Sequence, residues 1–170
     1  MDDELAVFCG REHQRLVAAL DLVCGSLPLA EDLAQETLVR VCQHWSRIRT
    51  MESPAAYAHR IALNLANSSF RRRAVERRAD VRLRADESHV WTDPDPANAV
   101  AVREALQQLR PDQRRVLVMR YYLGYSVNET ADVLRMPVGS VKTHALRGLA
   151  RLREALGGPV TAEDPAVGNA

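Results

Sequence analysis

Residues 125–153 carry the clearest chemical pattern in the chain, YSVNETADVLRMPVGSVKTHALRGLARLR. Ser126 followed by Glu129 predicts a capping box, in which the hydroxyl and the carboxylate each accept a backbone N–H at the start of a helix. Pro137 and Gly139 then predict a sharp turn into a second helix. Two short helices joined in this way form a helix-turn-helix, a motif whose second helix enters the major groove of duplex DNA.

The second helix of this motif divides into two faces at about 100° per residue. Its apolar residues fall within an arc of about 80° and predict the buried side: Val141, Ala145, Leu149, Leu152 and Leu156. The other side offers hydroxyls and cations for phosphates and base edges, and we predict that it contacts DNA through Ser140, Lys142, Thr143, His144, Arg147 and Arg151. The alternative is a solvated basic face on a helical hairpin. Arg135 stands where such turns usually place Gly, and it would tolerate a left-handed conformation only at a cost of about 1 kcal/mol, so we expect a distorted turn within an otherwise intact motif.

A second candidate nucleic-acid surface lies in residues 57–78, YAHRIALNLANSSFRRRAVERR. The spacing of Arg60, Asn64, Asn67 and Arg71 places these side chains on one narrow face of a helix, and Asn amides read base edges well. The predicted set, with an aromatic ring for stacking and further cations for phosphates, is Tyr57, Arg60, Asn64, Asn67, Arg71, Arg72 and Arg73. An ordinary solvated basic helix end is the alternative. For Trp45 and Phe70 we expect core packing.

The acidic helix of residues 29–45 has no spacing that indicates catalysis, because no His or second acidic pair converges with Glu31, Asp32 and Glu36. These carboxylates either cap and solubilise the helix or bind a basic protein surface. The three cysteines show neither zinc-ligand nor disulfide-framework spacing, and we expect three buried or half-buried thiols. No catalytic residue, metal site or cofactor is therefore expected, and the protein is not expected to be an enzyme.

Helices must position all of these residues, because only 5% of the chain is aromatic and apolar residues recur at helical spacing. One helix is expected to end at Gly25, the next to begin near Leu29, and a third to begin at Pro54 with Ser53 as its N-cap. A later helix is expected over residues 113–122. We predict an all-α protein of two small helical domains, residues 1–78 and 98–157, joined by a flexible linker at 79–97 and followed by a disordered tail at 158–170.

The net charge of +1 conceals a strong segregation of charge along the chain. Residues 1–36 hold eight acids and two Arg, whereas residues 60–84 hold eight Arg and two acids. Such asymmetry indicates more than one macromolecular partner, at least one of them polyanionic. Neither a membrane-spanning run nor a basic signal-peptide head is present, so we expect a cytoplasmic protein without membrane insertion.

Three segments in order resemble a known family: AEDLAQETLVRVCQHW, AYAHRIALNLANSSFRRR, and the stretch from Leu106 to Arg153. They are similar to conserved regions 2 and 4 of the extracytoplasmic-function (ECF, group IV) sigma-70 factors of bacterial RNA polymerase. The resemblance covers residues 5–156, and the chain's length agrees with a family that lacks the extra regions of housekeeping sigma factors. Because 22 of the 23 basic residues are Arg, a composition typical of high-GC genomes, the resemblance also suggests an actinobacterial source.

The resemblance implies a role for each segment in promoter-specific transcription initiation. The polar face with Asp32, Gln35, Glu36 and Arg40 would bind core RNA polymerase at the clamp helices of its largest catalytic subunit, with the flap as a further contact. The helix with Asn64 and Asn67 would melt and hold the -10 element as a single strand, and the helix of residues 140–153 would read the -35 element as duplex. Two small domains on a linker also suit an inhibitor that clamps them together, so an anti-sigma factor is a possible partner.

Two other classes of protein fit parts of the pattern. A free-standing helix-turn-helix regulator would use residues 1–78 to dimerise or to sense a ligand, and it would protect duplex DNA without polymerase. An enzyme would use the acidic helix, and replacing Glu31, Asp32 and Glu36 would abolish its turnover. A near-neutral sigma factor would instead bind nonspecific DNA weakly by itself and depend on polymerase for promoter recognition.

Overall fold

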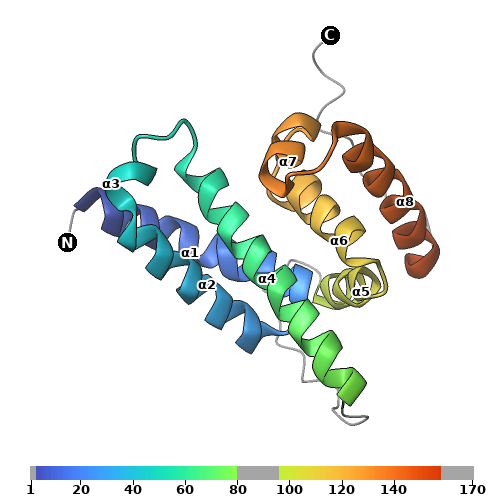
Figure 1. Ribbon diagram of the computed structural model, residues 1–170. Coiled ribbons are helices and arrows are strands. Elements are labelled where there is room, and N and C mark those ends of the chain that lie inside the picture. Colours follow the sequence, from blue (N-terminus) through green and yellow to red (C-terminus); the bar gives the residue numbers. More distant parts are fainter. Residues whose placement is uncertain (1–2, 80–95, 158–170) are drawn as a thin grey trace. The chain divides into compact units, whose positions relative to one another are not determined.

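The computed structural model describes residues 3–79 and 96–157, and every regular element in these two ranges is a helix. The chain divides into two compact units, Met1–His89 and Val90–Ala170 (Figure 1). The predicted all-α class with two helical domains is confirmed. Within the two described ranges, no helix is long and apolar enough to cross a membrane.

The first unit contains α1 (Asp3–Cys24), α2 (Leu27–Gln43), α3 (Trp45–Ile48) and α4 (Pro54–Ala79). Gly25 follows α1 with a φ of 70°, a conformation that glycine adopts without the strain of a Cβ. α2 begins two residues before the expected Leu29, because Pro28 fits the first helical turn, where no N–H is needed. The predicted N-cap of α4 is confirmed: the Ser53 hydroxyl accepts the N–H of Ala56 at 3.2 Å.

The core of the first unit lies where α1, α2 and α4 pack against one another (Figure 1). One cluster joins α1, α2, α3 and α4 and consists of Leu5, Phe8, Val41, Trp45, Ile48 and Ala58. The rings of Phe8 and Trp45 lie 5.1 Å apart in a tilted arrangement, and Trp45 is buried, so its predicted core role is confirmed. Tyr57 packs against the edge of the same cluster and is half-buried.

The second unit contains α5 (Pro96–Gln107), α6 (Pro111–Leu117), the π-helical segment η1 (Val118–Tyr122), α7 (Val127–Leu134) and α8 (Val138–Leu156). The helix predicted over residues 113–122 begins two residues earlier, because Pro111 occupies its first position. Its last five residues form a π-helix, in which the Leu123 N–H bonds to the Val118 carbonyl at 2.9 Å. α8 packs against α5, α6 and α7 (Figure 1).

The predicted linker at 79–97 and tail at 158–170 lie almost entirely outside the described residues. α4 extends to Ala79, and α5 begins at Pro96, so the helices overlap the ends of the predicted linker by one and two residues. The flexibility of both segments stays a prediction.

Candidate nucleic-acid and polymerase interfaces

The turn between α7 and α8 has the geometry that the sequence predicts. The Ser126 hydroxyl accepts the Glu129 N–H at 3.1 Å, and the Glu129 carboxylate accepts the Ser126 N–H at 2.7 Å. Hydrogen bonding by the side chain and backbone of Ser126 lowers the pKa of Glu129 from its usual value. Arg135 has a φ of 52° and adopts the left-handed conformation that Gly usually provides there, so the distortion expected at this position is not seen. The Met136 N–H closes the turn on the Ala131 carbonyl at 3.0 Å.

α8 leaves this turn with its predicted faces largely in place. Val141 and Leu152 are buried, and Ala145, Leu149 and Leu156 are half-buried. Of the residues predicted to contact DNA, Lys142, Thr143, Arg147 and Arg151 are exposed, whereas Ser140 and His144 are half-buried. The Thr143 hydroxyl donates to the Gly139 carbonyl at 2.8 Å, and the His144 Nδ1 is buried without a hydrogen-bond partner in the described part of the chain. Three of the four exposed residues of the predicted set are therefore cations.

Two features of α8 were not predicted from the sequence. Gly148 is buried, and a Cβ at this position would lie 3.1 Å from the Leu117 Cδ1, so α8 and α6 approach closely there. Leu146 is 71% exposed among the polar residues of α8. A hydrophobic side chain on a groove-facing helix can contact the methyl group of thymine. The helical angle of Leu146, next to Thr143 on the exposed side, is the signal in the sequence that points to it.

The candidate single-strand surface on α4 is partly open. Asn64, Arg71 and Arg72 are exposed, and Tyr57, Arg60 and Asn67 are half-buried. The side chain of Arg73 lies outside the described residues. Phe70, for which core packing is expected, is half-buried. The helix thus presents an amide and two guanidinium groups to solvent, three of the seven predicted residues.

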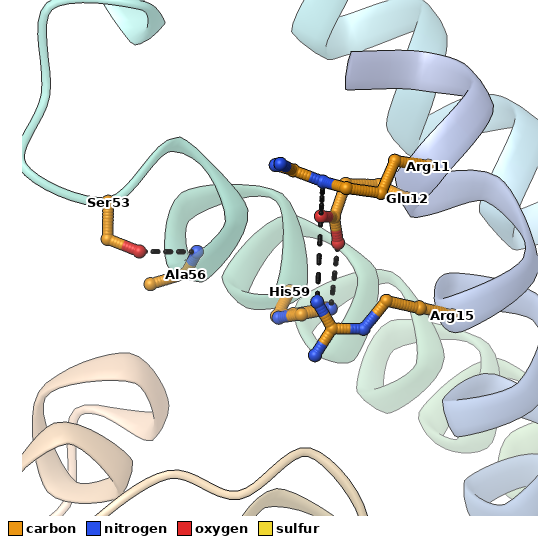
Figure 2. Close-up of polar contacts among 6 residues, drawn as sticks. All are labelled: Arg11, Glu12, Arg15, Ser53, Ala56 and His59. Atoms are coloured by element: carbon orange, nitrogen blue, oxygen red, sulfur yellow. Dashed lines mark hydrogen bonds and ion pairs between the residues drawn. The ribbon is translucent and has the colours of Figure 1, made fainter. Parts of the chain in front are cut away.

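A buried polar cluster holds this part of α4 against α1 (Figure 2). His59, one residue before Arg60, is buried, and its Nε2 lies 3.7 Å from the Oε2 of the fully buried Glu12. The other carboxylate oxygen of Glu12 accepts a hydrogen bond from the Arg11 Nε at 2.9 Å and lies 3.7 Å from the Arg15 Nη1. Burial lowers the pKa of His59 to about 4, because desolvation outweighs the attraction of Glu12, which raises the pKa. The positive charge of Arg15 also lowers it. No pattern in the sequence indicated this cluster.

The polar face of α2 is exposed at every predicted position, Asp32, Gln35, Glu36 and Arg40. The Arg40 Nη2 donates to the Glu36 Oε1 at 2.6 Å, an i,i+4 ion pair in which both side chains are 48% exposed. Val39 is 54% exposed beside these residues. This surface combines charges, an amide and an apolar side chain, a composition suited to a protein partner.

Each of the two units matches a known protein family. Residues 10–76 match the family Sigma-70 region 2, and residues 99–152 match Sigma-70, region 4. The RNA polymerase sigma-E factor of Streptomyces avermitilis is 35% identical over 127 residues, which cover 75% of this chain and 70% of the relative. The ECF RNA polymerase sigma factor SigX of Bacillus subtilis is 29% identical over 167 residues, covering 91% and 84% of the two chains.

The fold has a solved counterpart in the sigma factor RpoE of Bartonella quintana, crystallised with the anti-sigma factor NepR. The TM-score is 0.77 with 23% identity, and the match covers 85% of this chain and 91% of the other. The chain therefore belongs to the extracytoplasmic-function group of the sigma-70 family, the factors that direct RNA polymerase to initiate transcription at specific promoters.

Proposed function

We propose that the two units of this sigma factor make separate promoter contacts, with α8 reading the -35 element as duplex. The observation that carries this assignment is the division of α8 after the left-handed turn at Arg135: Val141 and Leu152 are buried, while Lys142 and Arg147 project from the other side. Cations at this position of a helix-turn-helix reach phosphates and guanine edges. The proposed contacts are Ser140, Lys142, Thr143, His144, Arg147 and Arg151.

For the first unit we propose that α4 holds the melted -10 element. The exposed Asn64 amide can donate to and accept from a base edge, and the half-buried Tyr57 ring can offer a face for stacking. The basic end of the helix neutralises the backbone of the strand. The proposed contacts are Tyr57, Arg60, Asn64, Asn67, Arg71, Arg72 and Arg73.

The exposed face of α2 supports a third assignment, the docking of core RNA polymerase. Asp32, Gln35, Glu36 and Arg40 would bind the clamp helices of its largest catalytic subunit, and the flap would contact the second unit. In this proposal the protein works in the cytoplasm, where its polymerase is, and carries no chemistry of its own. An anti-sigma factor that covers these faces would be its inhibitor. A free-standing regulator is not favoured, because residues 10–76 match sigma region 2.

Initiation assays with purified core polymerase and a library of promoters test the whole proposal. We expect a primer-independent, sequence-specific transcript and co-elution of the protein with core. A duplex footprint without polymerase, together with no transcript and no co-elution, would support the free-standing regulator instead.

Arg147→Ala tests the role of α8, with Arg153→Ala as its matched control. Both residues are exposed cations on α8, but Arg153 lies outside the proposed contacts. Loss of one phosphate or guanine contact costs about 1–3 kcal/mol, so Arg147→Ala should weaken use of promoters with an intact -35 element by about 5- to 150-fold. Affinity for core should not change. An equal effect of the two variants would contradict the assignment.

Asn64→Ala tests the role of α4. Permanganate footprints should show less melting around the -10 element, while initial duplex engagement persists, because the lost amide contacts only open bases. Gln14→Ala, an exposed amide on α1, is the control and should melt the promoter normally.

Asp32→Arg tests the α2 face against Asp3→Arg, since both positions are exposed acids: only the former should weaken binding to core.

A further inference from the structure

Two cysteines that are far apart in the sequence meet between α1 and α2. The Sγ atoms of Cys9 and Cys42 lie 4.0 Å apart, although 33 positions separate the residues. The antiparallel packing of α1 against α2 places Cys9, near the start of α1, beside Cys42, at the end of α2 (Figure 1). Sequence spacing alone indicated no pairing, because the tertiary packing of the helices creates it.

The two thiols differ in their access to solvent. Cys42 is exposed, contrary to the expectation of three buried or half-buried thiols, whereas Cys9 is half-buried and packs against the core cluster with Phe8 and Trp45. Burial, together with the charge and the hydrogen bond of the neighbouring Cys42, raises the pKa of Cys9 to about 11. Cys9 therefore stays protonated at neutral pH, and Cys42 is the sulfur that meets a dissolved oxidant first.

We propose that Cys9 and Cys42 form a redox modification site, which a hydroperoxide converts into a reversible disulfide between α1 and α2. The inference does not depend on the proposed contacts with DNA or polymerase. It requires only that one thiol is accessible and that the second lies within reach of it.

The reaction has two steps. The Cys42 thiolate attacks the terminal oxygen of the hydroperoxide, the O–O bond breaks, and the alkoxide leaves and takes a proton, which gives an alcohol and a sulfenic acid on Cys42. Cys9 then loses its proton, its sulfur bonds to the Cys42 sulfur, and the sulfenic hydroxyl leaves as water. In sum, two thiols and one hydroperoxide give one disulfide, one alcohol and one water, with the peroxide reduced and the thiols oxidised.

The geometry favours the second step over a competing oxidation. Disulfide sulfurs lie about 2.05 Å apart, so the two Sγ atoms must approach by about 2 Å. Holding Cys9 beside the sulfenic acid makes the attack intramolecular, so it should outpace further oxidation by dissolved peroxide. Cys24 lies at the other end of α1 and has no place in the pair.

Mass spectrometry of the full-length protein tests the proposal. The reduced, desalted chain is treated with a small excess of hydrogen peroxide at neutral pH, quenched and alkylated. We expect the oxidised protein to be a monomer that has lost two hydrogen atoms and that carries one alkyl group, where the reduced protein carries three, one on each Cys. Trypsin should release residues 1–11 linked to residues 41–47, while the peptide of residues 16–40, with Cys24, stays unlinked and alkylated. Dithiothreitol should restore all three thiols.

Variants separate this pair from general thiol oxidation. Cys24→Ser, the matched control, should form the same link as the natural chain. Cys9→Ser should form no internal link, and a sulfenic acid on Cys42 should then be trapped with dimedone. A link that contains Cys24, a disulfide between two molecules, a stable sulfinic acid on the natural chain, or three thiols that survive the peroxide would each overturn the proposal. The wild-type readout stands even where a variant folds poorly.

Discussion

The buried His59 predicts a specific loss of stability in acid. Its imidazole lies between α4 and α1, 3.7 Å from the Glu12 carboxylate, and burial lowers its pKa to about 4 (Figure 2). In the unfolded chain the same group has its ordinary pKa of 6.5. The native state therefore keeps His59 neutral over a pH range in which the unfolded state binds a proton.

The sign and size of the effect follow from these two pKa values. A group whose pKa is lower in the native state destabilises the fold as the pH falls below 6.5, and the effect is complete below about pH 4. By pH 5 the unfolded chain holds nearly one proton on this group, and the native state holds almost none. This difference lowers the free energy of unfolding by about 2 kcal/mol.

Urea unfolding at a series of pH values measures this loss. Replacing Trp91 by Phe leaves Trp45, in the core of the first unit, as the single tryptophan, so its fluorescence reports that unit. His59→Gln removes the titrating group, and its unfolding free energy should fall by about 2 kcal/mol less than that of the parent between pH 7 and pH 5. His44→Gln, which removes an exposed imidazole, should keep the parent's pH dependence.

The outcome distinguishes desolvation from ion pairing. If the attraction of Glu12 outweighed burial, His59 would be protonated in the native state, and the parent would become more stable than His59→Gln as the pH falls. That result, or parallel curves for the parent and His59→Gln, would refute the reasoning.

Four substitutions test local geometry, each by urea unfolding monitored by circular dichroism. Ser126→Ala removes the hydroxyl that accepts the Glu129 N–H and should destabilise the second unit by about 1 kcal/mol; an unchanged midpoint would contradict the cap. Gly148→Ala puts a methyl group 3.1 Å from Leu117 and should lower the free energy of unfolding by about 1–3 kcal/mol. Gly10→Ala, with nothing within 4 Å, should instead stabilise α1 by up to about 1 kcal/mol. A change of the same sign at both sites would contradict the packing. Arg135→Gly should stabilise the turn by about 1 kcal/mol, and a loss would show that the left-handed residue is not strained.

The features that the sequence predicted well are local ones. The caps at Ser53 and Ser126 depend on residues three positions away. Helical periodicity likewise located the buried side of α8, because Val141 and Leu152 lie on one face of a regular helix. Boundaries moved by two residues at Leu27 and at Pro111, where proline extends a helix at its first turn.

The features that were missed arise from packing between distant segments. In the sequence Gly148 is only a residue that weakens a helix, whereas in the structure Leu117 of α6 fills the space beside it. The contact of His59 with Glu12 joins α4 to α1, and the two residues share no pattern in the sequence. The residue types of the π-helical turn at Val118–Tyr122 also do not distinguish it from an α-helix in the sequence.

Burial decides which cationic side chains of the second unit are available to bind DNA. The Arg114 guanidinium donates to the carbonyls of Gln107 and Leu109 at 2.9 and 3.0 Å, and the Arg120 guanidinium donates to the Tyr125 carbonyl at 2.7 Å.

Both arginines are buried, so their guanidinium groups stabilise the backbone of the unit and are not available to bind a phosphate. The exposed cations of the proposed DNA face are Lys142, Arg147 and Arg151. Each phosphate contact adds about one counterion to the salt dependence of binding, so three such contacts give a much weaker salt dependence than the Arg content of the unit implies. Duplex binding by the free protein should therefore be weak, and we expect promoter selection to require that polymerase supply the remaining affinity by holding both units on one DNA molecule.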